Sequence, residues 1–381
     1  MDRTNRHHPH PAEDDADSDD TSSPSKFPMM STSHDMLSGL LLEDAILQNA
    51  FKKISNPLDK TFFLAVLAGF WVGLGGIAAL SVAGGIPVDV RNAWPFLPKL
   101  CIGLFFSFAL HLILLYGGEL FTGNVMVMNI GLLNRVTPPS RVALNLLTVY
   151  LGNWAGCLLT AYFFAYKTEL FVAEPYHSYL STLTLSKITG HGWGVLFLRA
   201  IPANTLVCVA VVLGLASRDA AGKILALYFP VVMFVVSSFE HCVANMFFIS
   251  TGLMYGAPST IGRLWFNQSA AFLGNIVGGA FVVALSMHLM NHWVSILPDA
   301  LGGGKPLEAG TVAAHDVEST RRARDFATHD EAAAHKVQLR RSLSMSMGTR
   351  DGGVGLPVRR SLSVSSRGVP PGTLSKEVSR V

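Results

Sequence analysis

Two six-residue segments of the chain share the pattern Glu-x4-Asn, and both lie inside long apolar runs. They are Glu119-Leu-Phe-Thr-Gly-Asn124 and Glu240-His-Cys-Val-Ala-Asn245, which start 121 positions apart. A second pair, Leu151-Gly-Asn-Trp-Ala-Gly156 and Leu273-Gly-Asn-Ile-Val-Gly278, repeats at nearly the same offset. A repeat with a polar centre in mid-span is typical of membrane transporters and channels with broken helices. Backbone leaves the helix at bilayer depth only where it lines a cavity or is covered by protein.

The composition agrees with a membrane domain flanked by polar tails. Half of the residues are hydrophobic, 14% are charged, and the mean hydropathy is +0.39 although both ends are polar. The four cysteines occur singly in apolar runs without metal-ligand spacing, so we expect neither a disulfide framework nor a metal site. No hydrolase or zinc-protease motif is present. We therefore expect no enzyme, no cofactor and no nucleic-acid partner.

The apolar runs predict an all-α membrane protein with six transmembrane helices in residues 57–297. Each run is long enough to cross a hydrocarbon core of about 30 Å. The second and fifth runs are too long for one helix, and each holds one Glu-x4-Asn segment, so we expect a helix, a break and a half-helix in each. The predicted spans are 61–85, 98–133, 142–166, 192–216, 223–254 and 268–292.

The flanking regions carry most of the charge. Residues 1–35 read as a disordered acidic tail, and 36–56 as an amphipathic helix on the cytoplasmic membrane surface. Residues 298–381 read as a disordered, basic, Ser/Arg-rich tail in which Ser344 and Ser363 follow arginines as in kinase sites. The distribution of lysine and arginine puts both termini in the cytoplasm. No signal peptide is recognisable, so the first span is expected to direct insertion.

The ionisable residues at membrane depth are the candidates for function, because burying charge there is costly. For Glu119 and Glu240 we expect chiefly a structural role. They would accept hydrogen bonds from the freed backbone N–H groups or pair with a buried cation such as Arg199, with direct proton transfer as the alternative. Asn124 and Asn245 suit the same task, since an amide both donates and accepts and so can cap a broken helix.

His241 differs from the other candidates. Its counterpart in the first copy is Leu120, so the break does not require a histidine. It is placed to face Thr122 or Asn124 across a pore. Since imidazole can hold or pass a proton near neutral pH, this position suits the transport of a weak acid.

Apolar residues leading into the break predict a hydrophobic constriction, which would exclude hydrated ions and pass a neutral molecule. Lys53 and Lys187 are expected at the cytoplasmic and outer mouths, where they would attract anions. The residues assigned to the constriction are Phe106, Leu110, Ile113, Leu120, Val207 and Phe234.

The run Phe239-Glu-His-Cys-Val-Ala-Asn-Met-Phe247, together with Leu120-Phe-Thr-Gly-Asn124, resembles the formate/nitrite transporter family. Residues 50–292 are most similar to the branch of unicellular parasites that exports lactate and other monocarboxylates with protons. The resemblance implies an aquaporin-like inverted repeat, a pore in each subunit and a homopentamer. It also implies a central His at His241, a neighbouring Thr at Thr122, and mouth lysines at Lys53 and Lys187.

The sequence therefore predicts a pentameric, multi-pass plasma-membrane protein that moves lactate, formate, acetate or pyruvate together with H⁺. One alternative is a nitrite or hydrosulfide conductor of the same family. Another is a channel for a small neutral solute of the aquaporin type. Such a channel has Asn-Pro-Ala in both half-helices, whereas here Asn124 precedes Val125 and Asn245 precedes Met246.

Overall fold

The computed structural model describes residues 36–294, which are helical apart from connecting segments and one isolated bridge. Both predicted tails, including Ser344 and Ser363, lie outside the described residues. The helices, with two π-helical stretches η1 and η2, are α1 (Gly39–Ser55), α2 (Leu58–Gly84), α3 (Val88–Ala93), α4 (Phe96–Phe106), α5 (Phe108–Leu115), α6 (Phe121–Leu133), α7 (Pro139–Leu159), η1 (Thr160–Tyr166), α8 (Tyr176–Ile188), α9 (Trp193–Ala216), α10 (Ala220–Val236), α11 (Cys242–Met254), α12 (Ile261–Ile276), η2 (Val277–Leu285) and α13 (Ser286–Asn291).

Within residues 36–294, five helical stretches are long and apolar enough to cross a membrane. They are α2, α4 with α5, α7 with η1, α9, and the continuous run from α12 through η2 to α13. The run 223–254, predicted as the fifth span, is divided between α10, with 17 residues, and α11, with 13. A count of six spans therefore stays a prediction.

Both long runs are interrupted where the Glu-x4-Asn repeat predicts a break. Helix α5 ends at Leu115 and α6 begins at Phe121, while α10 ends at Val236 and α11 begins at Cys242. Each break contains a residue with positive φ, namely Gly117 at 70° and Ser238 at 56°. This left-handed conformation stops helix propagation, so the glutamate that follows lies in extended chain before a new helix.

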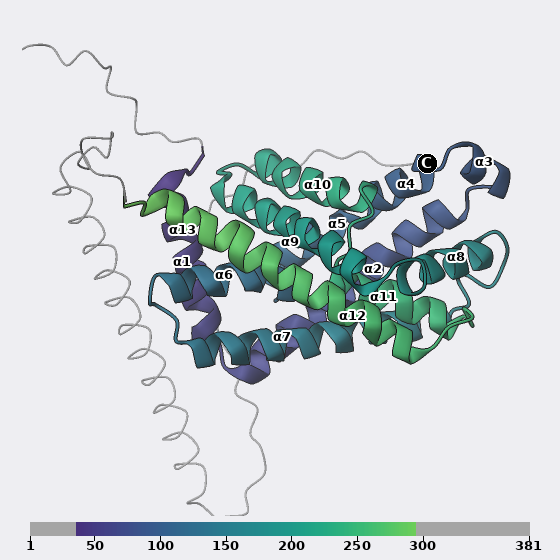
Figure 1. The fold of residues 1–381 in the computed structure, drawn as a ribbon, viewed down its shortest axis with the longest axis horizontal. Coiled ribbons are helices and arrows are strands. Elements are labelled where there is room, and N and C mark those ends of the chain that lie inside the picture. Colours follow the sequence, from purple (N-terminus) through teal and green to yellow (C-terminus); the bar gives the residue numbers. More distant parts are fainter. Residues whose placement is uncertain (1–35, 295–381) are drawn as a thin grey trace, which may run out of the picture. The chain divides into compact units, whose positions relative to one another are not determined.

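Glycines bring the long helices together in two equivalent pairs, α2 with α7 and α9 with α12 (Figure 1). A Cβ atom added to Gly156 of α7 would overlap the carbonyl oxygen of Val66 of α2, and one added to Gly274 of α12 would overlap that of Phe197 of α9. In lipid, such close backbone approach is a main source of helix association. These contacts fix the helices that hold the two breaks.

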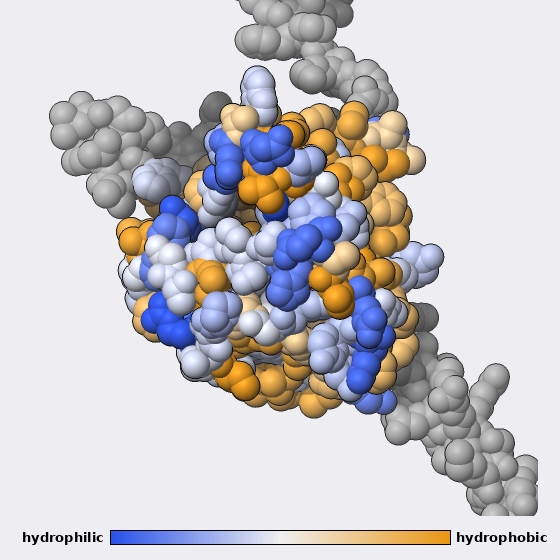
Figure 2. Space-filling model, turned by 90° about the vertical axis from the view of Figure 1, so that its right-hand side faces the viewer, coloured by the Kyte–Doolittle hydropathy of each residue, from blue (hydrophilic) through white to orange (hydrophobic). Residues whose placement is uncertain are grey.

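The two ends of the bundle differ in the elements they carry. Helices α3 and α8 lie at the right of Figure 1, and α1 and α13 lie at the left. Figure 2 views the end with α3 and α8, where hydrophilic residues gather in the middle and hydrophobic ones surround them. Helix α1, predicted as an amphipathic helix, packs Ile46 and Ala50 into a buried cluster with Met126 and Ile130 of α6.

Candidate functional site

The first break is braced by Asn153 of α7. Its Oδ1 accepts a hydrogen bond of 2.9 Å from the backbone N–H of Phe121, the first residue of α6. Its Nδ2 donates to the carbonyl oxygens of Ala65 and Glu119, each at 2.9 Å. One buried amide thus satisfies a free N–H at the start of the half-helix and two carbonyls beside it, as buried backbone requires.

The second break has the same arrangement around Asn275 of α12. Its Oδ1 accepts from the N–H of Cys242, the first residue of α11, at 2.9 Å. Its Nδ2 donates to the carbonyl oxygens of Ala200 at 2.7 Å and Glu240 at 3.0 Å. The correspondence extends the repeat from sequence to hydrogen bonding.

Glu119 lies in a buried polar cluster next to the first break. Its Oε2 accepts from Asn124 Nδ2 at 2.6 Å and from Lys53 Nζ, at the end of α1, at 2.8 Å. The same amide of Asn124 donates to Asn145 Oδ1 at 2.9 Å. The charge of the carboxylate is therefore balanced by a lysine, and its Oε2 accepts hydrogen bonds from two donors.

Glu240 has an equivalent set of partners. Its Oε2 accepts from Asn245 Nδ2 at 2.6 Å and lies 3.2 Å from Lys187 Nζ of α8. Asn245 also donates to Asn267 Oδ1 at 2.8 Å. Glu240 is 4% exposed, so this ion pair is shielded from solvent and is screened weakly by salt.

These contacts correct three details of the sequence analysis. The carboxylates pair with Lys53 and Lys187 instead of Arg199, whose Nη1 lies 2.6 Å from His191 Nε2. The freed N–H groups of the half-helices go to Asn153 and Asn275, because these amides project from neighbouring helices at the right height. Asn124 and Asn245 bind the glutamates, and the residues at the N-cap positions are Leu120 and His241.

His241 connects the two breaks. Its Nδ1 accepts a hydrogen bond from the N–H of Ala244 at 3.1 Å, which caps α11, and its Nε2 lies 2.9 Å from Thr122 Oγ1 of α6. Since Nδ1 accepts, the neutral ring carries its proton on Nε2 and donates it to Thr122. The ring is buried and stacks on Phe234, with centroids 5.6 Å apart. The proximity of His241 and Thr122 is thus as predicted.

A cavity of about 640 Å³ reaches His241 from the end that carries α3 and α8. Among the described residues that line this cavity, four are lysine or arginine, and one, Glu240, is acidic. An excess of positive charge over low-dielectric walls raises the local concentration of anions. The basic lining residues are Arg91, Lys99, Lys187 and Arg199.

A second, much smaller cavity of about 20 Å³ lies beyond His241. It has room for about one water molecule. All six residues assigned to the constriction line it, and Phe106, Phe234 and His241 border both cavities. These apolar side chains come from α4, α5, α9, α10 and, in the case of Leu120, from the first break, and they surround one narrow space.

Four asparagines of the site were missed as functional residues in the sequence analysis. Asn153 and Asn275 stand at the same place in the second repeated pair, to which no functional role was assigned. Asn145, in the third predicted span, and Asn267, one residue before the sixth, recur at the offset of the second repeated pair. Asparagines that recur at the offset of the repeat within apolar runs could therefore have identified these four residues as part of the site.

Two braced helix breaks, a basic vestibule and an apolar constriction on a bundle of membrane-length helices define a membrane transporter or channel. Comparison with known proteins gives the family. The family model described as formate/nitrite transporter matches residues 42–289, and the chain belongs to the formate/nitrite transporter family. This confirms the predicted family and a transport protein instead of an enzyme.

Individual relatives and solved structures agree with this family assignment. The chain is similar to a probable formate transporter of Methanothermobacter thermautotrophicus, with 37% identity covering 61% of this chain and 89% of the relative. It is 38% identical to formate-nitrite transporter 2 of Toxoplasma gondii over 62% of this chain, and it spans about half (52%) of that relative. A solved pentameric formate channel with formate bound matches with a TM-score of 0.54 and 27% identity, over 61% of this chain and 97% of that one.

Proposed function

We propose that this protein carries small monocarboxylates, such as formate, lactate, acetate and pyruvate, together with a proton through a pore in each subunit. The observation that carries the proposal is the His241–Thr122 hydrogen bond, which joins the two breaks where a basic vestibule meets an apolar constriction. A protonatable ring at that boundary is placed to act on an anion before it enters the dry segment.

The first step is attraction of the anion. Arg91, Lys99 and Arg199 line the vestibule, and Lys187 is held there by Glu240. The carboxylate loses water as it moves toward His241, and desolvation disfavours the charged form of a weak acid. The anion therefore gains affinity for a proton as the passage narrows.

The second step is protonation and crossing. The carboxylate takes a proton from water in the vestibule, or from His241 after the ring has taken up a second proton and become an imidazolium. The neutral acid then passes the apolar residues that would exclude a hydrated ion. His241 recovers a proton from solvent, and transport is electroneutral because the charge of the anion and that of the proton cancel.

The assembly and topology follow the family. We propose six spans arranged as an inverted repeat, a homopentamer like the solved formate channel, and a plasma-membrane location with both termini in the cytoplasm. The exposed apolar side chains of the long helices, among them Phe163, Leu198 and Phe281, would face lipid or neighbouring subunits.

The experiment is uptake of labelled formate and lactate into proteoliposomes containing the purified full chain. An inwardly directed proton gradient should drive accumulation of both acids, and collapse of the gradient with a protonophore should abolish it. Nitrite and hydrosulfide are assayed in parallel. Uptake of these alone, with neither carboxylate accumulated, would contradict the proposal.

A further inference from the structure

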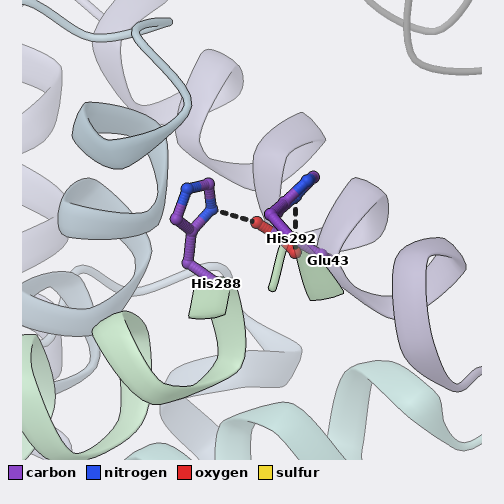
Figure 3. Close-up of side chains that lie close together, drawn as sticks. All are labelled: Glu43, His288 and His292. Atoms are coloured by element: carbon purple, nitrogen blue, oxygen red, sulfur yellow. Dashed lines mark hydrogen bonds and ion pairs between the residues drawn. The ribbon is translucent and has the colours of Figure 1, made fainter. Parts of the chain in front are cut away.

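A cluster of three potential metal ligands lies at the end of the bundle opposite the vestibule. Glu43 of α1 faces His288 of α13 and His292 directly after that helix (Figure 3). Glu43 Oε1 lies 3.0 Å from His288 Nδ1, and Oε2 lies 3.4 Å from His292 Nε2. The two imidazole rings are 4.5 Å apart, as their spacing of four residues on one helical face allows.

The carboxylate in this cluster is prepared as an anionic ligand. Glu43 is 2% exposed, and Asn134 and Asn291 donate hydrogen bonds to it at 2.8 and 2.6 Å. Amides that orient a carboxylate in this way are typical supports of metal ligands.

We propose that Glu43, His288 and His292 form a binding site for a divalent transition-metal cation of the Zn²⁺ type. Two imidazole nitrogens and one carboxylate oxygen are a common ligand set for Zn²⁺, with water completing a tetrahedron. Bonds of about 2.0–2.1 Å place tetrahedral ligand atoms roughly 3.3 Å apart. The three ligand atoms here all lie within 4.8 Å of one another, so small side-chain rotations suffice.

The arrangement leaves a path for the ion. His288 and His292 side chains are 21% and 30% exposed, whereas Glu43 forms the buried floor of the site. A bound cation would replace the contacts between the rings and the carboxylate while leaving both amide bonds in place. It would tie α1 to the C-terminal end of the last long helix, at a position separate from His241.

The test measures metal binding by the purified full chain in detergent. Zn²⁺ stoichiometry and affinity are determined by competition with a chromophoric chelator, and Co²⁺ absorption reports tetrahedral coordination. His288→Ala/His292→Ala is compared with the wild type and with His177→Ala/His191→Ala, which removes two histidines from elsewhere in the described residues. All three proteins keep the same histidines in residues 1–35 and 295–381, so background binding there cancels.

The wild type and the His177/His191 control should bind about one more ion per chain than His288→Ala/His292→Ala. They alone should give the tetrahedral Co²⁺ spectrum. Asn291→Ala, which removes a support and no ligand, should weaken binding about 10- to 100-fold. If the double variant does not fold, His292→Ala alone serves, because His292 lies outside the helix. Equal stoichiometry and affinity in wild type and the His288/His292 variants would overturn the site.

Discussion

At the scale of single residues, His241 has two separable tasks, capping α11 through Nδ1 and holding a proton on Nε2 toward Thr122. Asparagine is a favourable N-cap residue but does not titrate near neutral pH. We expect His241→Asn to keep the thermal stability of the wild type while proton-driven formate uptake falls about tenfold or more. Thr122→Val removes the hydroxyl that bonds to His241 and leaves the ring in place, so it should reduce formate uptake less than His241→Asn does. Wild-type uptake by His241→Asn would remove the ring from the mechanism.

The pairing of Lys187 with Glu240 belongs to the same scale. Lys187→Met leaves the buried carboxylate of Glu240 without its cation, and this should lower the free energy of unfolding by about 3 kcal/mol. Adding Glu240→Gln removes the unpaired charge and should recover most of the lost stability. Thermal unfolding of all variants in the same detergent measures this. Lys60→Met, at an exposed position, is the matched control and should change little. A double variant no more stable than Lys187→Met would show that the pair is energetically unimportant.

At the scale of elements, each half-helix depends on one asparagine from a neighbouring helix. Asn153→Ala leaves the N–H of Phe121 without its partner, at a cost of about 1–3 kcal/mol. Hydrogen exchange should accelerate in residues 117–124 and stay unchanged in 238–245, and Asn275→Ala should give the converse pattern. Asn129→Ala, which removes an amide that donates to the carbonyl oxygen of Val125 in its own helix, should leave hydrogen exchange in both segments unchanged. Equal acceleration at both breaks would contradict independent bracing.

Much of this element-level arrangement could be predicted from the sequence, because a polar centre in an overlong apolar run permits few structures. The repeat located both breaks, and Phe106, Leu110 and Ile113, which were assigned to the constriction, line one cavity. The pairing of Lys53 with Glu119 could not be predicted, since 66 residues separate them and α1 had no assigned contacts. The roles of Asn153 and Asn275 depend on helix crossings that spacing alone does not specify.

At the scale of the whole molecule, a basic vestibule, the ring of His241 and an apolar constriction follow one another along one passage. In the proposed function the vestibule concentrates anions, whereas the constriction would admit only a neutral species. These two properties are compatible only if a proton joins the substrate between them. The proposed function therefore requires that each substrate molecule crosses together with one proton.

The most direct test counts protons and substrate in the same proteoliposomes. Labelled formate inside and the internal pH, read with a trapped fluorescent dye, are followed together while a potassium diffusion potential is imposed or omitted. The account predicts about one proton per formate and the same rate with or without the potential, because the transported species is neutral. Formate uptake that follows the potential, without internal acidification, would contradict it.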